Sequence, residues 1–321
     1  MILANHDSPR ILILRGGALG DFVLTLPAIR ALRRHWPLAA IELLAHPGFA
    51  GLAVEAGLVN RARSLDAAGL AQWFVPRRIW PERERSEIAS FDLILSYLGD
   101  VAGVVQANLR TAGAPLVKAC SPIVAAGHAV DHFLRPVMDL GIAAPSGAGP
   151  LLVWPEALRQ QGRQALKEMG LAGNVISLHP GSGSIRKNWP AEKFLLLADR
   201  VRHCLGARPL FVLGEADTAA AQTLLTLKPA VPVFINRTLK EVASVLAASR
   251  GYVGNDSGIT HLAAALGIPV VALFGPTDAE RWGPRGAQVG ILRGREPTSE
   301  ALAAIEPDAV LQVLANLIED C

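Results

Sequence analysis

Short aliphatic runs alternate with longer stretches of helical periodicity along the chain, and this alternation is the strongest constraint on its fold. The run Ile11 to Leu14 is followed by a Gly-Gly pair and then by an amphipathic stretch from Pro27 to His35, which predicts a strand, a tight loop and a helix. We expect Pro27 in the first helical turn, where its missing N–H has no intrahelical partner to lose. Strands joined by helices pair in parallel, so the pattern predicts an α/β protein.

Further runs of strand length continue this pattern in both halves of the chain. They lie at residues 41–45, 93–97, 175–178, 210–213, 233–235, 252–254 and 270–274. Between the two groups, Ala143 to Pro155 is rich in small residues and proline, which predicts an interdomain linker. The length of 321 residues, with 51% hydrophobic and 18% charged, suits two globular domains. We therefore predict Rossmann-like domains at 1–148 and 149–305, and a C-terminal helix at 306–321 that packs back on the first domain.

Composition excludes several other classes of protein. The richest apolar stretch, Leu262 to Gly275, is interrupted by glycine and proline and is too short to span a bilayer. The run Ile11 to Leu14 ends at Arg15, too early for the apolar region of a secretion signal, so we expect a cytoplasmic protein. A net charge of +3 is too small to suggest nucleic-acid binding, and three cysteines without C-x-x-C spacing favour reduced thiols.

The motifs of several common enzyme classes are also absent. No two aspartates stand in D-x-D spacing, the form in which a carboxylate pair commonly holds a metal-bound nucleotide sugar. The sequence also lacks H-E-x-x-H, G-x-S-x-G and the G-x-G-x-x-G dinucleotide fingerprint. His128 and His132 lie four residues apart, but no further zinc ligands accompany them, so we interpret them as structural. We expect neither a metal nor a cofactor.

The glycine loop Gly16 to Asp21 directly follows the first predicted strand, where an open α/β sheet places its ligand. Its glycines allow backbone N–H groups to approach a bound group, and Asp21 adds a carboxylate at the same place. Two interpretations of Asp21 stay open at this point. It is either a catalytic carboxylate or the N-terminal cap of the following helix.

A second loop, residues 179–190, follows the first strand of the second half. It combines small residues with the hydroxyls of Ser182 and Ser184 and with the cations of Arg186 and Lys187. Exposed amides, hydroxyls and cations together suit a pyrophosphate. The alternative is a polar turn whose cations are merely solvated.

A third loop, residues 254–262, lies between a strand and an Ala-rich helix. It would direct free N–H groups and the positive end of the helix toward an anion. Taken singly, Asp256 is more often a helix cap, and His261 is more often a satisfied core histidine. Three such loops, all at the carboxyl ends of predicted strands, favour a binding site for a diphosphate.

A possible acceptor region lies in the first half, at residues 73–85. It mixes aromatic side chains with several arginines, among them Arg77 and Arg78, whose guanidinium forks would suit phosphates or carboxylates. Three glutamates nearby make a solvated charged surface the alternative. If the acceptor is lipid-linked, this region would also touch the inner leaflet of the membrane.

Together with their flanks, the three loops resemble the heptosyltransferase family of lipopolysaccharide core synthesis, glycosyltransferase family 9. The segments 11–31, 178–194 and 253–284 carry the resemblance in that order and spacing, and it covers nearly the whole chain. His179 to Pro190 and Asn255 to Leu262 are its most specific parts.

This resemblance implies a GT-B fold, in which two Rossmann-like domains with parallel sheets face a central cleft. It also implies an inverting, metal-independent transfer of heptose from ADP-heptose to a hydroxyl of a saccharide or lipopolysaccharide-core acceptor. The expected partners are a nucleotide sugar and a saccharide or glycolipid, with peripheral contact to the inner membrane. An alternative is a related transferase that uses another nucleotide sugar for capsule, glycoprotein or natural-product glycosylation.

The resemblance also assigns roles to residues in both halves. Asp21 matches the proposed general base, and Lys187 matches the basic residue that contacts the diphosphate, as a lone ammonium among uncharged amides. On the nucleotide side we expect Ser182, Gly183, Ser184, Arg186, Asp256, Ser257, Gly258 and His261, with either Glu215 or Asp217 near the ribose. On the acceptor side we expect Gly17, Ala18, Gly20, Arg77 and Arg78.

Overall fold

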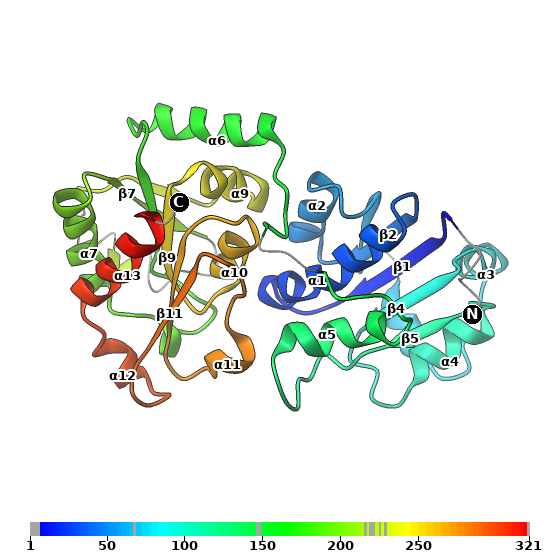
Figure 1. Ribbon diagram of the computed structural model, residues 1–321. Coiled ribbons are helices and arrows are strands. Elements are labelled where there is room, and N and C mark those ends of the chain that lie inside the picture. Colours follow the sequence, from blue (N-terminus) through cyan, green and yellow to red (C-terminus); the bar gives the residue numbers. More distant parts are fainter. Residues whose placement is uncertain are drawn as a thin grey trace. The chain divides into compact units, whose positions relative to one another are not determined.

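Two parallel β-sheets organise the chain, one in each half of the computed structural model (Figure 1). The structure describes residues 7–66, 69–145, 149–214, 217, 222–224, 226–227 and 230–319. Two units, Met1–Gly147 and Ala148–Cys321, divide the chain within the linker that the composition predicts. In the described part of the chain, no helix is both long enough and apolar enough to cross a membrane.

The sheet of the first unit has the strand order β3-β2-β1-β4-β5. Its strands are β1 (Arg10–Arg15), β2 (Ala40–Ala45), β3 (Arg61–Ser64), β4 (Leu93–Tyr97) and β5 (Val117–Ala119). Its helices are α1 (Leu19–His35), α2 (Pro47–Glu55), the 3₁₀-helix η1 (Leu70–Phe74), α3 (Glu82–Ala89), α4 (Val104–Thr111) and α5 (Ala129–Met138). The strand order reverses between β1 and β4, and an open α/β sheet binds its ligand at the carboxyl ends of the strands beside such a reversal.

The second unit repeats this arrangement with one more strand, in the order β11-β10-β9-β6-β7-β8. Its strands are β6 (Val175–His179), β7 (Arg208–Leu213), β8 (Val233–Ile235), β9 (Gly251–Asn255), β10 (Val270–Phe274) and β11 (Val289–Arg293). Its helices are α6 (Glu156–Glu168), η2 (Ile185–Lys187), α7 (Ala191–Cys204), α9 (Leu239–Ala248), α10 (Gly258–Ala265), α11 (Ala279–Trp282), α12 (Ser299–Ala303) and α13 (Pro307–Glu319). Here the order reverses between β6 and β9, so their carboxyl ends form the expected ligand position.

Every strand predicted from an aliphatic run is present, but the first helix begins earlier than predicted. Helix α1 starts at Leu19, so Pro27 lies inside the helix and its expected place in the first turn is wrong. An interior proline costs about 3 kcal/mol because it loses a hydrogen bond and crowds the preceding turn. Phe22, Val23 and Leu26 are all buried, and their burial offsets that cost.

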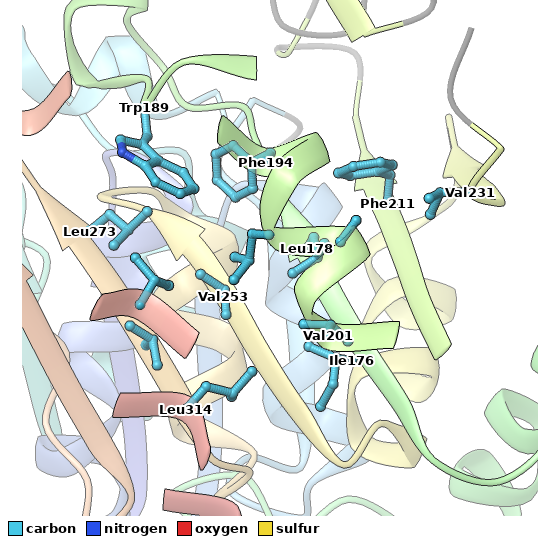
Figure 2. Close-up of a cluster of buried hydrophobic side chains, with 14 of the residues drawn as sticks. Ile176, Leu178, Trp189, Phe194, Val201, Phe211, Val231, Val253, Leu273 and Leu314 are labelled. Atoms are coloured by element: carbon cyan, nitrogen blue, oxygen red, sulfur yellow. The ribbon is translucent and has the colours of Figure 1, made fainter. Parts of the chain in front are cut away.

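The terminal helix α13 packs in the core of the second unit, where it lies against α7, β9, β10 and β11 (Figure 1). Its buried residues Val310, Leu314 and Ile318 join a hydrophobic cluster with side chains from β6, β9 and β10. Figure 2 shows Leu314 on the side of this cluster opposite Trp189. The apolar face of this helix thus covers the second sheet, and its packing back on the first domain stays a prediction.

Truncation of Leu314 tests this placement. Because Leu314 has no exposed surface, Leu314→Ala should leave a cavity and lower the free energy of unfolding of the second unit by about 2–5 kcal/mol. Gln312→Ala on the exposed side of the same helix is the control and should change it by less than about 0.5 kcal/mol. The measurement is chemical denaturation, and equal effects of the two substitutions would contradict the packing.

Candidate active site

The carboxylate of Asp21 lies at the start of α1, just beyond the carboxyl end of β1. Its Oδ2 accepts a hydrogen bond from the N–H of Ala18 at 3.1 Å, which satisfies a donor at the start of the helix. Gly17 has a φ of 90°, and a β-carbon at this position would lie 2.8 Å from that same oxygen. Glycine is therefore required here. Asp21 is not the N-cap residue, which is Ala18; it caps the helix from the third helical position, and its side chain stays 30% exposed and open to a ligand.

Arg15 is a fully buried cation beneath this loop. Its Nη2 donates to the carbonyl oxygen of Asp21 at 3.0 Å and lies 3.5 Å from Oδ1 of the Asp21 carboxylate. Its Nη1 donates to the carbonyl of Tyr97 on β4, and its guanidinium lies 4.5 Å from the ring centre of Phe133. Burial lowers the pKa of Arg15, and the charge of Asp21 opposes that shift. Sequence reasoning missed this residue, although a cation that ends an aliphatic strand was a usable signal.

The arginines predicted to bind the acceptor lie between η1 and α3 and differ in environment. Arg77 is exposed. The side chain of Arg78 is only 6% exposed; its guanidinium stacks over Trp80 at 4.5 Å and contacts Glu84 at 2.5 Å. This contact corrects our expectation of an open guanidinium fork at Arg78, because the side chain is already used in packing. Acceptor binding by Arg77, and by the Gly17 to Gly20 loop, stays a prediction.

In the second unit, the structure brings Lys187 and Asp256 together at the carboxyl ends of β6 and β9. The ammonium of Lys187 lies 2.8 Å from Oδ2 of Asp256, and the aspartate side chain is only 8% exposed. We expected a lone ammonium, and this ion pair corrects that. A carboxylate repels a diphosphate, so Asp256 is better suited to hold Lys187 than to contact the nucleotide.

The loop between β6 and η2 divides into an inward and an outward side. The hydroxyl of Ser182 is buried, 2.7 Å from the carbonyl of Ser184 and 2.6 Å from Oδ1 of Asn188. It therefore stabilises the loop rather than facing a ligand. Gly183 and Arg186 are exposed and Ser184 is half-buried, so these residues form the side of the loop open to an anion.

Asn255, the last residue of β9, holds both ends of this loop. Its side-chain oxygen accepts from the N–H of Trp189 at 3.0 Å, and its amide donates to the carbonyl of Pro180 at 2.8 Å. The asparagine has no exposed surface, so these hydrogen bonds lie inside the protein. The sequence analysis gives Asn255 no role of its own, and the structure shows that it positions the loop carrying Lys187.

Helix α10 begins directly after β9 and is capped by Ser257. The Ser257 hydroxyl accepts from the N–H of Thr260 at 3.3 Å, so this serine is the N-cap. The alternative of Asp256 as the helix cap is therefore wrong. Gly258 is the first helical residue and is half-buried. His261 is buried within the helix, as the core interpretation predicted, and a nucleotide contact from it stays a prediction.

His179 links this helix to the strand β7. Its Nε2 lies 3.0 Å from Oδ2 of Asp217, and its Nδ1 lies 3.3 Å from the Ser257 hydroxyl. Burial alone would raise the pKa of Asp217, but the hydrogen bond and charge of His179 and the N–H of Gly214 outweigh burial and lower it. A β-carbon on Gly181 would overlap the Asp217 carboxylate, so glycine is required there too.

The contacts of Asp217 argue against one of the two acidic residues expected near the ribose. Asp217 is buried and its carboxylate is already bonded to His179 and to the backbone of Gly214, so it is not open to a sugar hydroxyl. Glu215 lies outside the described residues, and its contact with the ribose stays a prediction.

The two histidines of the first unit have local structural partners. His128 caps α5 by accepting from the N–H of Val130 at 3.1 Å, and Nε2 of His132 lies 2.7 Å from the carbonyl of Ser121. Within the described ranges, no group of three or more His, Cys, Asp or Glu side chains is arranged to hold a metal ion. The local contacts of both histidines agree with the structural interpretation of this pair, and the expected absence of a metal stays a prediction.

Known proteins are similar to this chain in sequence and in architecture. Residues 144–307, about half of the chain, match the family model of glycosyltransferase family 9 (heptosyltransferase). Lipopolysaccharide heptosyltransferase 1 of Pseudomonas aeruginosa is 25% identical over 295 residues, which cover 84% of this chain and 79% of that protein.

Solved structures agree in fold over nearly the full length. The glycosyltransferase family 9 protein of Veillonella parvula superposes with a TM-score of 0.79 at 21% identity, covering 98% of both chains. The heptosyltransferase WaaC of E. coli, solved with ADP, gives a TM-score of 0.72 at 22% identity over 96% of this chain and 99% of that one. The GT-B prediction of two parallel-sheet α/β domains is thereby confirmed. The chain belongs to glycosyltransferase family 9, the heptosyltransferase family.

Proposed function

We propose that this protein transfers heptose from ADP-heptose to a hydroxyl of a saccharide or lipopolysaccharide-core acceptor, with inversion and without a metal. One observation carries the proposal. The chain belongs to the heptosyltransferase family, and at the strand-order reversal of its second unit it brings together the exposed Gly183, the half-buried Gly258 and the positioned ammonium of Lys187. A helix N-terminus, amides and a cation are the groups that stabilise a departing diphosphate. The ADP complex of the E. coli relative supports a nucleotide of this kind.

In this reaction Asp21 would act as the general base. Its carboxylate would take the proton of the acceptor hydroxyl while the oxygen attacks the anomeric carbon opposite the leaving ADP. The bond from the anomeric carbon to the diphosphate breaks, and the configuration inverts. Lys187 and the amides near Gly183 and Gly258 would stabilise the charge that grows on the terminal phosphate. The proposal requires Asp21 and Lys187 to act on the same pair of substrates.

Release of ADP from ADP-heptose is the direct test of the reaction. Purified protein should release ADP with a lipopolysaccharide-core acceptor, and chelation of divalent metals should leave the rate unchanged. The donor is identified by thermal shift, because the true nucleotide sugar stabilises the folded state by mass action while others do not. A larger shift with another nucleotide sugar would replace the heptose assignment, and loss of activity on chelation would refute metal independence.

The substitution Asp21→Asn tests the general base. Because positioned proton transfer is worth about 10²- to 10⁴-fold, kcat should fall by that factor while the Kd of ADP stays nearly constant. Asp92→Asn is the matched control, since Asp92 also accepts a backbone N–H, from Arg10 at 2.8 Å, but lies at the amino end of β4. Turnover of Asp21→Asn equal to that of the control would rule out this role.

Removal of the Lys187 ammonium tests diphosphate binding. A charge-assisted contact is worth about 1.5–3 kcal/mol, so Lys187→Ala should raise the Kd of ADP about 10- to 100-fold in calorimetry. Lys167→Ala, on the exposed side of α6, removes the same charge and should leave the Kd unchanged.

The single substitution also leaves Asp256 unpaired. Lys187→Ala combined with Asp256→Asn therefore separates the loss of the cation from the repulsion by the uncovered carboxylate. The double variant should bind ADP more tightly than Lys187→Ala and more weakly than the unaltered protein. Unaltered affinity in both variants would exclude a direct contact of Lys187 with the diphosphate.

A further inference from the structure

The guanidinium of Arg15 joins the end of β4 to the first turn of α1. Its Nη2 and Nε donate to the carbonyl of Asp21 at 3.0 and 3.3 Å, and its Nη1 donates to the carbonyl of Tyr97 at 3.3 Å. A guanidinium carries its donors in a rigid planar fork, so these bonds fix Asp21 relative to the sheet. The Arg15 side chain has no exposed surface, so it can affect a substrate only through its neighbours.

The two oxygens of the Asp21 carboxylate face different donors. Oδ2 accepts from the N–H of Ala18 at 3.1 Å, and Oδ1 lies 3.5 Å from Nη2 of Arg15. The first contact is a hydrogen bond, and the second is an attraction between opposite charges. Together they set the plane of the carboxylate. An ionised carboxylate has about four lone-pair sites, so each oxygen keeps capacity for an acceptor hydroxyl on its open side.

Stability alone does not require a cation at position 15. Burial lowers the pKa of Arg15, which reflects the cost of placing its charge in the protein interior. An apolar side chain would avoid that cost, and such replacements are often neutral for stability when no buried charge loses its partner. Asp21 would keep its contact with water, since its side chain is 30% exposed, and its carbonyl would keep the hydroxyl of Thr25 at 2.9 Å.

We propose that Arg15 is a positioning residue, which holds the Asp21 carboxylate in the orientation that takes the proton of the acceptor hydroxyl. Arg15 touches neither substrate, and no bond or proton at Arg15 changes in this step. The inference rests on the proposed function, because it requires Asp21 to be the general base.

The substitutions Arg15→Met and Arg15→Lys test this role. A small misplacement of a catalytic group costs up to about 10²-fold, so Arg15→Met should lower kcat about 10- to 100-fold per folded molecule. The KM of the acceptor and the Kd of ADP should change less than about threefold, because Arg15 contacts neither substrate. Arg15→Lys keeps the charge but not the fork, so its kcat should lie between those of Arg15→Met and the unaltered protein.

The substitution Arg33→Met is the matched control. Arg33 lies near the other end of α1, is half-buried, and also donates to backbone carbonyls, those of Leu58 at 3.2 Å and Ala39 at 2.8 Å. Its loss should lower the thermal stability and leave kcat per folded molecule unchanged. If Arg33→Met lowers kcat as much as Arg15→Met does, the effect is a general loosening of the unit and the inference is overturned.

A double-mutant cycle with Asp21→Asn gives a test that does not depend on the folding of Arg15→Met. Because Arg15 acts through the Asp21 carboxylate, Arg15→Lys should lower kcat in the unaltered protein and change it less than about twofold in Asp21→Asn. A kcat of Arg15→Lys equal to that of the unaltered protein, or an equal loss in both backgrounds, overturns this inference and leaves the role of Asp21 intact. If Asp21→Asn itself keeps full turnover, the general-base assignment in the proposed function fails instead.

Discussion

The reversal of strand order in each parallel sheet determines where this protein can bind a ligand. Crossovers on either side of a reversal leave to opposite faces of the sheet, so the loops between them separate and expose backbone amides. In the second unit the reversal lies between β6 and β9, whose following loops carry Lys187 and Ser257. In the first unit it lies between β1 and β4, where Asp21 follows β1. All the chemistry proposed above uses groups at these two edges.

Behind each exposed group, a buried charged or polar residue fixes its position. Arg15 holds the backbone of Asp21, and Asp256 holds Lys187. Burial of a charge is expensive unless the charge is paired, so such contacts add little net stability. They do remove conformational freedom from the side chains that would touch substrates, and catalysis benefits from groups that are already oriented.

The sequence predicted local structure well and tertiary partners poorly. Aliphatic runs located the strands, and the residues after them located the candidate loops, because both signals lie within a few neighbouring positions. The role of Arg15 depends on Tyr97, 82 residues away, and the core position of α13 depends on strands far earlier in the chain. Periodicity marks Leu314 as apolar but does not indicate which sheet it covers. Likewise, composition could not separate Glu215 from Asp217, since only the contact with His179 reveals a buried carboxylate.

The Lys187–Asp256 ion pair brings no net charge to the second unit's loops. Asp256 neutralises Lys187 in the free protein, which avoids an unpaired ammonium on a partly buried side chain. In the proposed reaction, amides, hydroxyls and the start of α10 would therefore hold the diphosphate together with Lys187. Such dipoles are fixed by the fold and need no rearrangement when charge moves to the leaving group.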